Sequence, residues 1–193
     1  MIIGLTGPIA SGKDELAKLF MKNGAYVLDV DKVAHELYSV HSPVWQKLVA
    51  AFGSKVLNRG GIINRKKLGA IVFSDKAAMH RLNKIVHPAL KEAVINLIQE
   101  HPTLIVINAA VLKEIGLIEI VDQVWVVMAS RERRLKRLLR KGSSKENALK
   151  RINSQLPQKE YLEMADVLIK NDGSLKEFHK KADQEMIKIN AAV

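Results

Sequence analysis

A glycine-rich segment near the start of the chain constrains the fold most strongly. Residues 1–5 are apolar and predict a buried strand, and residues 13–23 have the periodicity of an amphipathic helix. Between them lies a Gly-x4-Gly-Lys turn. Backbone N–H groups of such a turn, together with the start of the following helix, bind phosphate. We therefore expect a nucleotide phosphate site at Gly7, Pro8, Ile9, Ala10, Ser11, Gly12, Lys13 and Asp14. An ordinary glycine-rich turn between a strand and a helix is the alternative.

Two residues of this turn bear on its chemistry. Lys13 supplies a positive charge for the β- and γ-phosphates. The next position usually holds Ser or Thr, whose hydroxyl binds Mg²⁺, but here it holds Asp14. Asp14 could hold Mg²⁺ directly or through water, or it could mark a weakened nucleotide site. It could also simply favour the helix N-terminus, as carboxylates do.

Apolar strands and helices alternate along the chain. This alternation predicts an α/β fold with a parallel sheet covered by helices on both faces, in a single domain of residues 1–193. The alternation is interrupted by a helical stretch that is too long for one crossover, which we interpret as an inserted subdomain over 31–100. Its helices are expected over 31–51, broken near Ser42-Pro43, and over 65–73, 75–85 and 88–100, the last starting at Pro88. Later elements are strands at 25–29, 103–108, 123–128 and 166–170, and helices at 130–141, 144–155 and 174–190.

Two carboxylates follow the second expected strand. Asp29 and Asp31 lie at the carboxyl end of that strand, which is the edge where ligands bind in open α/β sheets. Alternating residues of an extended strand share a face, so both carboxylates could point toward the phosphate site. Transfer of a phosphoryl group to a hydroxyl benefits from a carboxylate that accepts the proton. We favour Asp31 for that role and expect one of the pair to be a helix N-cap.

The helix expected over 130–141 is strongly basic, with seven Lys and Arg side chains within residues 131–141. Arg133, Arg137 and Arg140 fall on one face of this helix. Guanidinium groups over a transferring phosphate stabilise its charge, often from a mobile lid. We expect this role for Arg137 and Arg140, and a solvated basic surface for most of the others.

Composition limits the function classes. The chain has 31 Lys and Arg against 20 Asp and Glu, a net charge of +11 that favours anionic partners. It has no Cys, which excludes disulfides and thiolate metal sites. Its His residues lack metal-ligand spacing, so we expect no zinc. Its apolar runs are short and no signal peptide is visible, so we expect a cytoplasmic protein without a membrane span. The low aromatic content and the lack of a DNA- or RNA-binding motif argue against nucleic acid as a partner.

Beyond these features, the chain resembles the dephospho-coenzyme A kinase family along nearly its whole length. The shared motifs run in order from Gly4-Leu-Thr-Gly7 to Asn171-Asp-Gly-Ser174. Between these ends they include Asp29-Val-Asp31, Phe52-Gly53, residues 61–69, 71–73 and 82–88, Arg137-Leu-Leu-Arg140, Arg151-Ile152 with Gln155, and residues 165–173.

The resemblance implies a P-loop kinase fold with a five-stranded parallel sheet, a helical CoA-binding subdomain and a lid near 130–157. It implies transfer of phosphate from ATP, with Mg²⁺, to the ribose 3′-hydroxyl of dephospho-CoA. By position, the resemblance implies that Asp31 is the catalytic base and that Arg65 and Arg140 contact phosphate or substrate. It implies that Thr6 lies near the loop and that His87 lies in the substrate subdomain. It also implies that Asn171, Asp172 and Gly173 lie near the adenine of ATP. A hydrogen-bonded His at a helix start is the alternative for His87.

Several positions depart from the family pattern. Asp14 replaces Ser or Thr, Pro8 and Ala10 replace glycines, Arg134 replaces a Gln, and Ala110-Val111-Leu112 replaces Pro-Leu-Leu. A degenerate nucleotide- or CoA-binding protein without turnover is therefore one alternative. A kinase for another nucleotide-like substrate is a second alternative, and the sequence does not give the oligomeric state.

Overall fold

A five-stranded parallel sheet forms the centre of the fold. The computed structural model describes residues 1–101 and 104–190, so residue 103 of one expected strand lies outside the described residues. The strand order is β2-β3-β1-β4-β5, which places β1 in the middle of the sheet. Gly4 of β1 pairs with Ile107 of β3 on one side and with Val124 of β4 on the other. This confirms the predicted five-stranded α/β fold. The strands are β1 (Ile2–Thr6), β2 (Tyr26–Asp29), β3 (Ile105–Asn108), β4 (Gln123–Met128) and β5 (Val167–Lys170).

The chain divides into two compact units. The first contains the sheet and consists of Met1–Leu28, His101–Lys113 and Leu117–Val193. The second consists of Asp29–Glu100 and Glu114–Gly116. Besides the strands, the first unit has α1 (Lys13–Lys22), η2 (Ile118–Ile120), α6 (Arg131–Arg140), α7 (Lys145–Asn153), α8 (Gln158–Glu163) and α9 (Leu175–Asn190). The second has α2 (Val30–Glu36), α3 (Pro43–Phe52), η1 (Ser54–Val56), α4 (Arg65–Ser74) and α5 (Lys76–Gln99).

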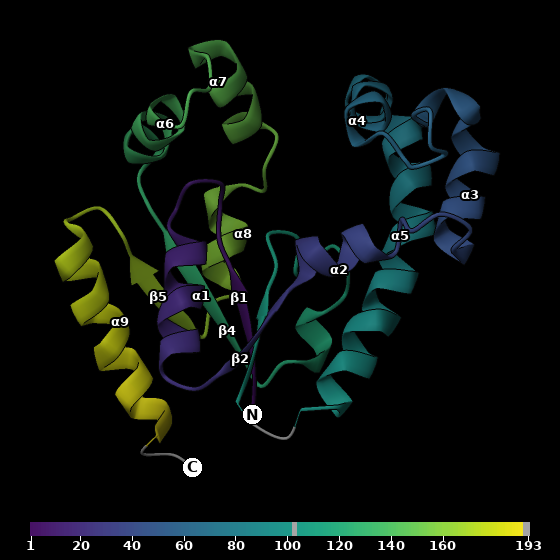
Figure 1. Ribbon diagram of the computed structural model, residues 1–193. Coiled ribbons are helices and arrows are strands. Elements are labelled where there is room, and N and C mark those ends of the chain that lie inside the picture. The colour runs from purple at the N-terminus through teal and green to yellow at the C-terminus, as the bar shows by residue number, and fades with distance from the viewer. Residues whose placement is uncertain (102–103, 191–193) are drawn as a thin grey trace. The chain divides into compact units, whose positions relative to one another are not determined.

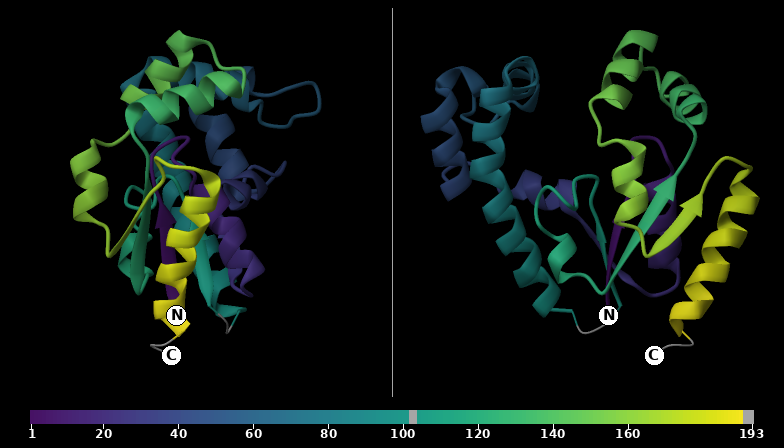
Figure 2. Two further views of the ribbon diagram at one scale, coloured as in Figure 1. Left: turned by 90° about the vertical axis from the view of Figure 1, so that its left-hand side faces the viewer. Right: turned by 180° about the vertical axis from the view of Figure 1, so that it is seen from behind.

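The main core of the first unit lies between one face of the sheet and two helices. Helices α1 and α9 lie side by side on this face, and α8 lies on the opposite face (Figures 1 and 2). Leu16 and Phe20 of α1 and Phe178 of α9 are buried against Leu5 of β1. Phe20 meets Trp125 of β4 edge to face, with ring centroids 5.0 Å apart. Such edge-to-face packing adds to the stabilisation that burial of the two rings provides.

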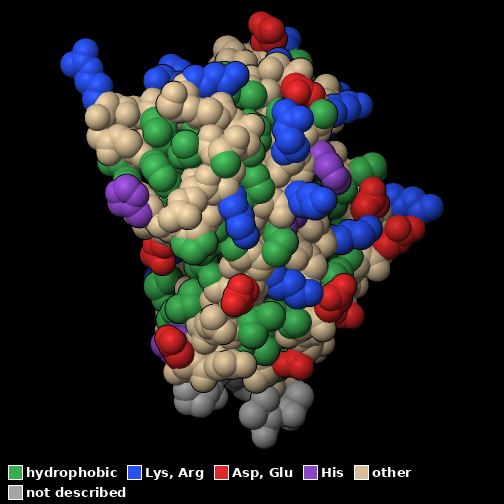
Figure 3. Space-filling model, turned by 90° about the vertical axis from the view of Figure 1, so that its right-hand side faces the viewer, with side chains coloured by type: hydrophobic (Ala, Val, Ile, Leu, Met, Phe, Trp, Pro, Cys, Tyr) green, Lys and Arg blue, Asp and Glu red, His purple; other side chains and the backbone are tan. Residues whose placement is uncertain are grey.

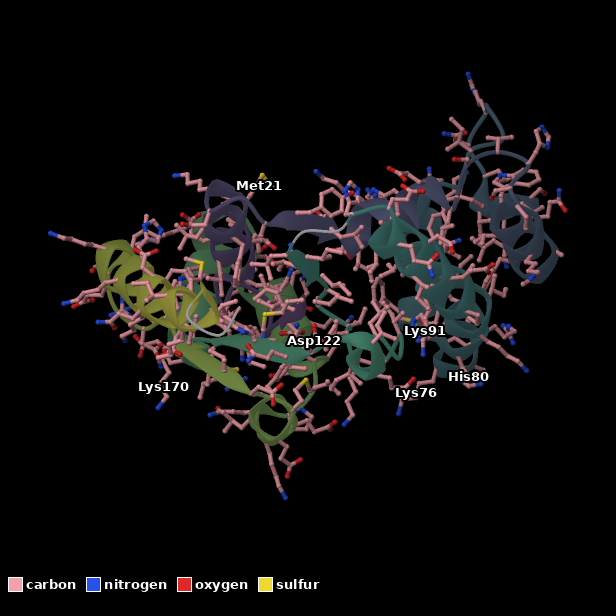
Figure 4. The ribbon with its side chains drawn as sticks, turned by 90° about the horizontal axis from the view of Figure 1, so that it is seen from below. Met21, Lys76, His80, Lys91, Asp122 and Lys170 are labelled. Atoms are coloured by element: carbon pink, nitrogen blue, oxygen red, sulfur yellow. The ribbon has the colours of Figure 1, made fainter. Side chains whose placement is uncertain are left out.

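The amino edge of the sheet is closed by its own carboxylates. Asp122, which precedes β4, accepts the N–H of Ile2 at 2.6 Å (Figure 4). Asp166, which precedes β5, accepts the N–H of Val124 at 2.7 Å. Each carboxylate therefore satisfies a backbone donor at the start of the neighbouring strand. These two aspartates therefore have a structural role at the amino edge of the sheet, and the candidate active site lies at the carboxyl edge.

Two expectations for the second unit were wrong. Residues 76–99 form one helix, α5, and Pro88 lies inside it rather than at a helix start. An internal proline costs about 3 kcal/mol because it removes a backbone hydrogen bond. The cost is met by packing, since α5 contacts α2, α3 and α4 along its length. The second error concerns Asp31, because the chain turns into helix α2 at Val30 and the strand alternation expected for Asp29 and Asp31 does not exist.

The surface is mixed in charge on the face that Figure 3 shows. Basic side chains on this face are interspersed with acidic and hydrophobic ones. Among the described residues, no helix is both long and apolar enough to cross a membrane.

Helix α8 was not expected from the sequence, since its six residues are too few to show a clear helical period.

Candidate active site

The buried polar residues of the described chain gather around the phosphate turn. Thr6 ends β1, Asn108 ends β3, Asn171 follows β5, and Ser11 lies within the turn itself. Polar groups are buried at a cost unless they are hydrogen-bonded or used for binding. Their clustering at the carboxyl ends of three strands therefore marks this edge as the functional one, as expected for an open parallel sheet.

The turn over residues 7–12, called the phosphate loop below, is tightly surrounded. Gly7 and Gly12 both have positive φ, of 152° and 111°. A Cβ at Gly7 would collide with the carbonyl oxygen of Val127, and a Cβ at Gly12 would collide with the side chain of Asn171. Glycine is therefore required at both positions, because the φ angle is unfavourable for other residues and because a side chain would clash. Ala10 also lies in the left-handed region, at φ 61°.

Ala10 provides a stability test of the loop conformation. Ala10→Gly is expected to change the free energy of unfolding by less than about 0.5 kcal/mol, because relief of left-handed strain is offset by unfolded-state entropy. Ala10→Val is expected to lower it by about 2 kcal/mol, since a β-branched side chain tolerates positive φ poorly. Urea unfolding measures both. A valine variant as stable as the parent would show that the loop does not hold this φ.

Lys13, Asp14 and Asn108 form a network at the first turn of α1. The Nζ of Lys13 donates to Asp14 Oδ1 at 3.0 Å and to Asn108 Oδ1. Asn108 Nδ2 donates to the same Asp14 oxygen at 3.4 Å. Burial raises the pKa of Asp14, but the charge and hydrogen bond of Lys13 outweigh it, so the pKa lies below its usual value. Asp14 is thus a carboxylate at neutral pH, and its negative charge lies next to the cation of the loop.

Asn108 was missed in the sequence. Its signal was a single polar residue that closes an otherwise apolar strand, at the edge where ligands bind. Thr6 lies at the corresponding end of β1, where its Oγ1 is 3.5 Å from the carbonyl oxygen of Ala110. The carboxyl ends of β1 and β3 thus place one hydroxyl and one amide beside the phosphate loop.

Arg137 of α6 holds the phosphate loop from outside. Its Nη1 donates to the carbonyl oxygens of Ala10 at 3.0 Å and Ser11 at 2.8 Å. Its Nη2 donates to Asn171 at the backbone oxygen, 2.8 Å, and at Oδ1, 3.1 Å. Burial lowers the pKa of Arg137, the charge of Asp172 raises it, and the net pKa is lower than usual. The group remains a cation, because guanidinium does not lose its proton in proteins.

The segment after β5 supports the same loop. Asn171 Nδ2 donates to the carbonyl oxygen of Ser11 at 2.7 Å, which completes the contact with Arg137. Asp172 Oδ1 accepts the N–H of Ser130 at 2.7 Å, and this hydrogen bond lowers the pKa of Asp172. Gly173 follows on the surface. Contact of residues 171–173 with an adenine stays a prediction. The hydrogen bond from Asn171 to the loop was not expected from the sequence.

Two other arginines of α6 differ in exposure. Arg140 is exposed at the end of α6, so its side chain is open to solvent. Arg134 is half-buried and donates to Gln155 Oε1 at 3.2 Å. Arg134 therefore has a structural partner in Gln155.

The second unit contains the other expected site residues. Asp29 is the N-cap of α2, since its Oδ1 accepts the N–H groups of Asp31 at 3.1 Å and Lys32 at 3.3 Å. Asp31 is exposed in the first turn of that helix, so its own carboxylate is accessible. The expectation that one of the two carboxylates is a cap is confirmed for Asp29. The role of Asp31 as the proton acceptor stays a prediction.

Arg65 and His87 each contact a neighbour within the second unit. Arg65 begins α4, and its Nη1 lies 3.3 Å from His35 Nδ1. His87 lies inside α5, with Nδ1 3.0 Å from the carbonyl oxygen of Glu114. A carbonyl only accepts, so Nδ1 of His87 carries the proton and donates it. His87 is therefore hydrogen-bonded as one alternative expected, but it does not mark a helix start.

The phosphate loop and the start of α1 are the part of this site that indicates anion binding. Lys13 and Asp14 begin α1, so their backbone N–H groups have no acceptor within the helix and are available to an anion. The described residues contain no group of three or more His, Asp or Glu side chains that could hold a metal ion alone. A divalent cation here would need oxygens from a bound nucleotide in addition to protein ligands.

Comparison with known proteins agrees with this reading. A model of the dephospho-CoA kinase family matches residues 1–177. A dephospho-CoA kinase of Carboxydothermus hydrogenoformans is 38% identical over 179 residues, covering 90% of this chain and 87% of that protein. The solved dephospho-CoA kinase of Campylobacter jejuni is 27% identical with a TM-score of 0.75, covering 99% of this chain and 98% of that one.

A more distant structure extends the fold alone. Shikimate kinase of Bacteroides thetaiotaomicron has a TM-score of 0.58 at 12% identity, and covers 98% of each chain. Its similarity supports a kinase-type fold and carries nothing about the substrate. The family model and the curated relative each span most of the chain, and the chain belongs to the dephospho-CoA kinase family.

Proposed function

We propose that this chain transfers the γ-phosphoryl group of ATP to the ribose 3′-hydroxyl of dephospho-CoA and so forms coenzyme A. The observation that carries the proposal is the phosphate loop with Lys13 at its end, held by Arg137, in a chain of this family. The second unit, which contains the predicted insertion 31–100, would bind dephospho-CoA. The segment 130–157 would serve as the lid.

The residues at the loop fit ATP and Mg²⁺. The N–H groups at the start of α1 and the Nζ of Lys13 suit phosphate oxygens. The oxygens of Asp14 and Asn108 are the hard ligands that Mg²⁺ prefers. Mg²⁺ would offset negative charge on the phosphates during transfer. The Lys13 contact with both oxygens indicates that Lys13 must move toward the nucleotide when these oxygens bind metal.

Catalysis would rest on positioning and charge. Lys13 would stabilise the charge of the transferring phosphoryl group, and Arg140 would add a second cation from the lid. Asp31 would accept the proton of the attacking hydroxyl. Contacts with the substrate are proposed for Thr6, Arg65, His87 and Arg137, and contacts with the adenine of ATP for Asn171, Asp172 and Gly173.

The two carboxylates at the start of α2 give a matched pair of variants. Asp31→Asn is expected to lower kcat by about 10²-fold or more with little change in the KM for ATP, because only the proton acceptor is lost. Asp29→Asn removes an equal charge but keeps a good N-cap, so its kcat is expected within about twofold of the parent. Steady-state kinetics at pH 7.5 compares them. Equal losses in both variants would remove Asp31 from the base role.

One observation favours a binding protein without turnover. Asp14 places a carboxylate against Lys13, where the kinase pattern has a neutral hydroxyl. Such a chain would retain nucleotide at the loop and fail to transfer phosphate. The two functions differ in product, so chromatography of a mixture of protein, ATP, Mg²⁺ and dephospho-CoA separates them. The kinase produces CoA and ADP in equal amounts, with the new phosphate on the 3′-oxygen by ³¹P NMR, and the binding protein produces neither.

A further inference from the structure

Gln155, in the connection between α7 and α8, reaches the phosphate loop with its side chain. Its Oε1 accepts the backbone N–H of Ile9 at 2.8 Å and lies 3.2 Å from Nη1 of Arg134. Both partners are N–H groups that only donate. The atom between them is therefore the amide oxygen, so the two contacts fix the orientation of the Gln155 amide.

The same end of the loop packs on the α6–α7 pair. Ile9 and Ala10 lie against an apolar cluster formed by Leu138, Ala148 and Ile152. Arg137 binds the carbonyl oxygens on the next stretch of the loop. One side of the loop is thus fastened by carbonyl contacts and apolar packing, and Gln155 supplies the acceptor for the amide at Ile9.

This amide needs an acceptor because of its place in the loop. Ile9 is half-buried and is followed by Ala10 in the left-handed region. A backbone donor that loses its partner at a half-buried position is costly, and the loop would relax by rotating the peptide. Rotation there would reorient the N–H groups further along the loop, which are the ones that bind phosphate.

We propose that Gln155 is a positioning residue that keeps the phosphate loop in its nucleotide-binding shape by holding the Ile9 amide, with Arg134 orienting its side chain. The inference deepens the proposed function and rests on it for its effect on nucleotide. Gln155 acts through the loop backbone. Its loss therefore changes the affinity for ATP and ADP, while kcat at saturating ATP stays within about twofold.

The test compares Gln155→Leu and Gln155→Glu with Gln158→Ala, an exposed glutamine at the start of α8. Hydrogen exchange of the Ile9 amide is measured first, in protein without nucleotide. Leucine fills a similar volume without an acceptor, so Ile9 is expected to exchange about tenfold faster. Glutamate keeps an oxygen acceptor, so exchange is expected to stay near the parent rate, as in Gln158→Ala.

Affinity for ADP is measured next by calorimetry at 10 °C, a temperature at which the variants are expected to remain folded. Gln155→Leu is expected to bind ADP about 3- to 10-fold more weakly, with Gln158→Ala unchanged. Unchanged ADP affinity in Gln155→Leu overturns the proposal, even if the variant unfolds at a lower temperature. Weaker affinity with unchanged Ile9 exchange also overturns it, since Gln155 would then act by direct contact. A parent protein that binds no ADP contradicts the proposed function instead, and Ile9 exchange still decides whether Gln155 holds the loop.

Discussion

Lys13→Met is expected to lower the turnover of dephospho-CoA by about 10²–10³-fold. Two effects add up in this variant. The cation at the phosphate loop is lost, and Asp14, which Lys13 contacts at 3.0 Å, keeps an unpaired negative charge beside the phosphates. Methionine has a similar length to lysine, so packing around α1 changes little. Steady-state kinetics with saturating ATP and dephospho-CoA measures the loss.

The double variant Lys13→Met with Asp14→Ser separates these effects. Removing the unpaired carboxylate is expected to recover part of the lost turnover, so the effects of the two substitutions are not additive. Circular dichroism and urea unfolding are used to check that both variants are folded. Retention of more than a tenth of the parent turnover in Lys13→Met would contradict the role given to this lysine.

Arg137→Met is expected to lower the free energy of unfolding by about 2–4 kcal/mol and to weaken ADP binding at least tenfold. The substitution removes four contacts to the oxygens of Ala10, Ser11 and Asn171. It removes the side-chain donor of the Ala10 carbonyl oxygen, whereas the Ser11 oxygen keeps the donor of Asn171 Nδ2. Urea unfolding and calorimetry with ADP give the two quantities.

Arg140 provides the matched comparison on the same helix. It is exposed, so Arg140→Met is expected to change stability by less than about 0.5 kcal/mol. Its turnover is expected to fall because its proposed contact is with the transferring phosphate. If Arg137→Met were as stable as Arg140→Met and bound ADP normally, Arg137 would not hold the loop.

The phosphate loop could be predicted because its signals are local. The strand, the turn and the helix all fall within the first 23 residues, and each has its own pattern. The sheet could be predicted for the same reason, since apolar strands alternate with helices. The basic helix was also visible, but periodicity alone could not say that Arg137 faces the loop and Arg140 faces solvent.

The contacts that hold the loop could not be predicted because they join distant residues. Arg137 meets residues 126 and 127 positions earlier, and Gln155 meets Ile9 at a separation of 146. Such pairs have no signature in one sequence. The prediction that a helix starts at Pro88 was wrong for a related reason. Contacts of α5 with three other helices offset the local cost of an internal proline.

Asp31 shows the limit of a strand argument. The expected alternation needed an extended chain beyond Asp29, but Asp29 caps a helix instead. Residue type identified a cap at this place, and only the structure showed which of the two carboxylates it is. The remaining carboxylate, that of Asp31, is therefore the one that the mutational comparison with Asp29 tests.

The most direct test of the account is CoA formation by the parent chain and by Asp14→Ser, measured side by side with ATP, Mg²⁺ and dephospho-CoA. The parent is expected to form CoA and ADP in equal amounts, with Asp14 serving in place of the usual hydroxyl at the metal position. An inert parent together with an active Asp14→Ser variant would contradict it, and would show that this chain keeps the kinase fold and the phosphate loop without the reaction.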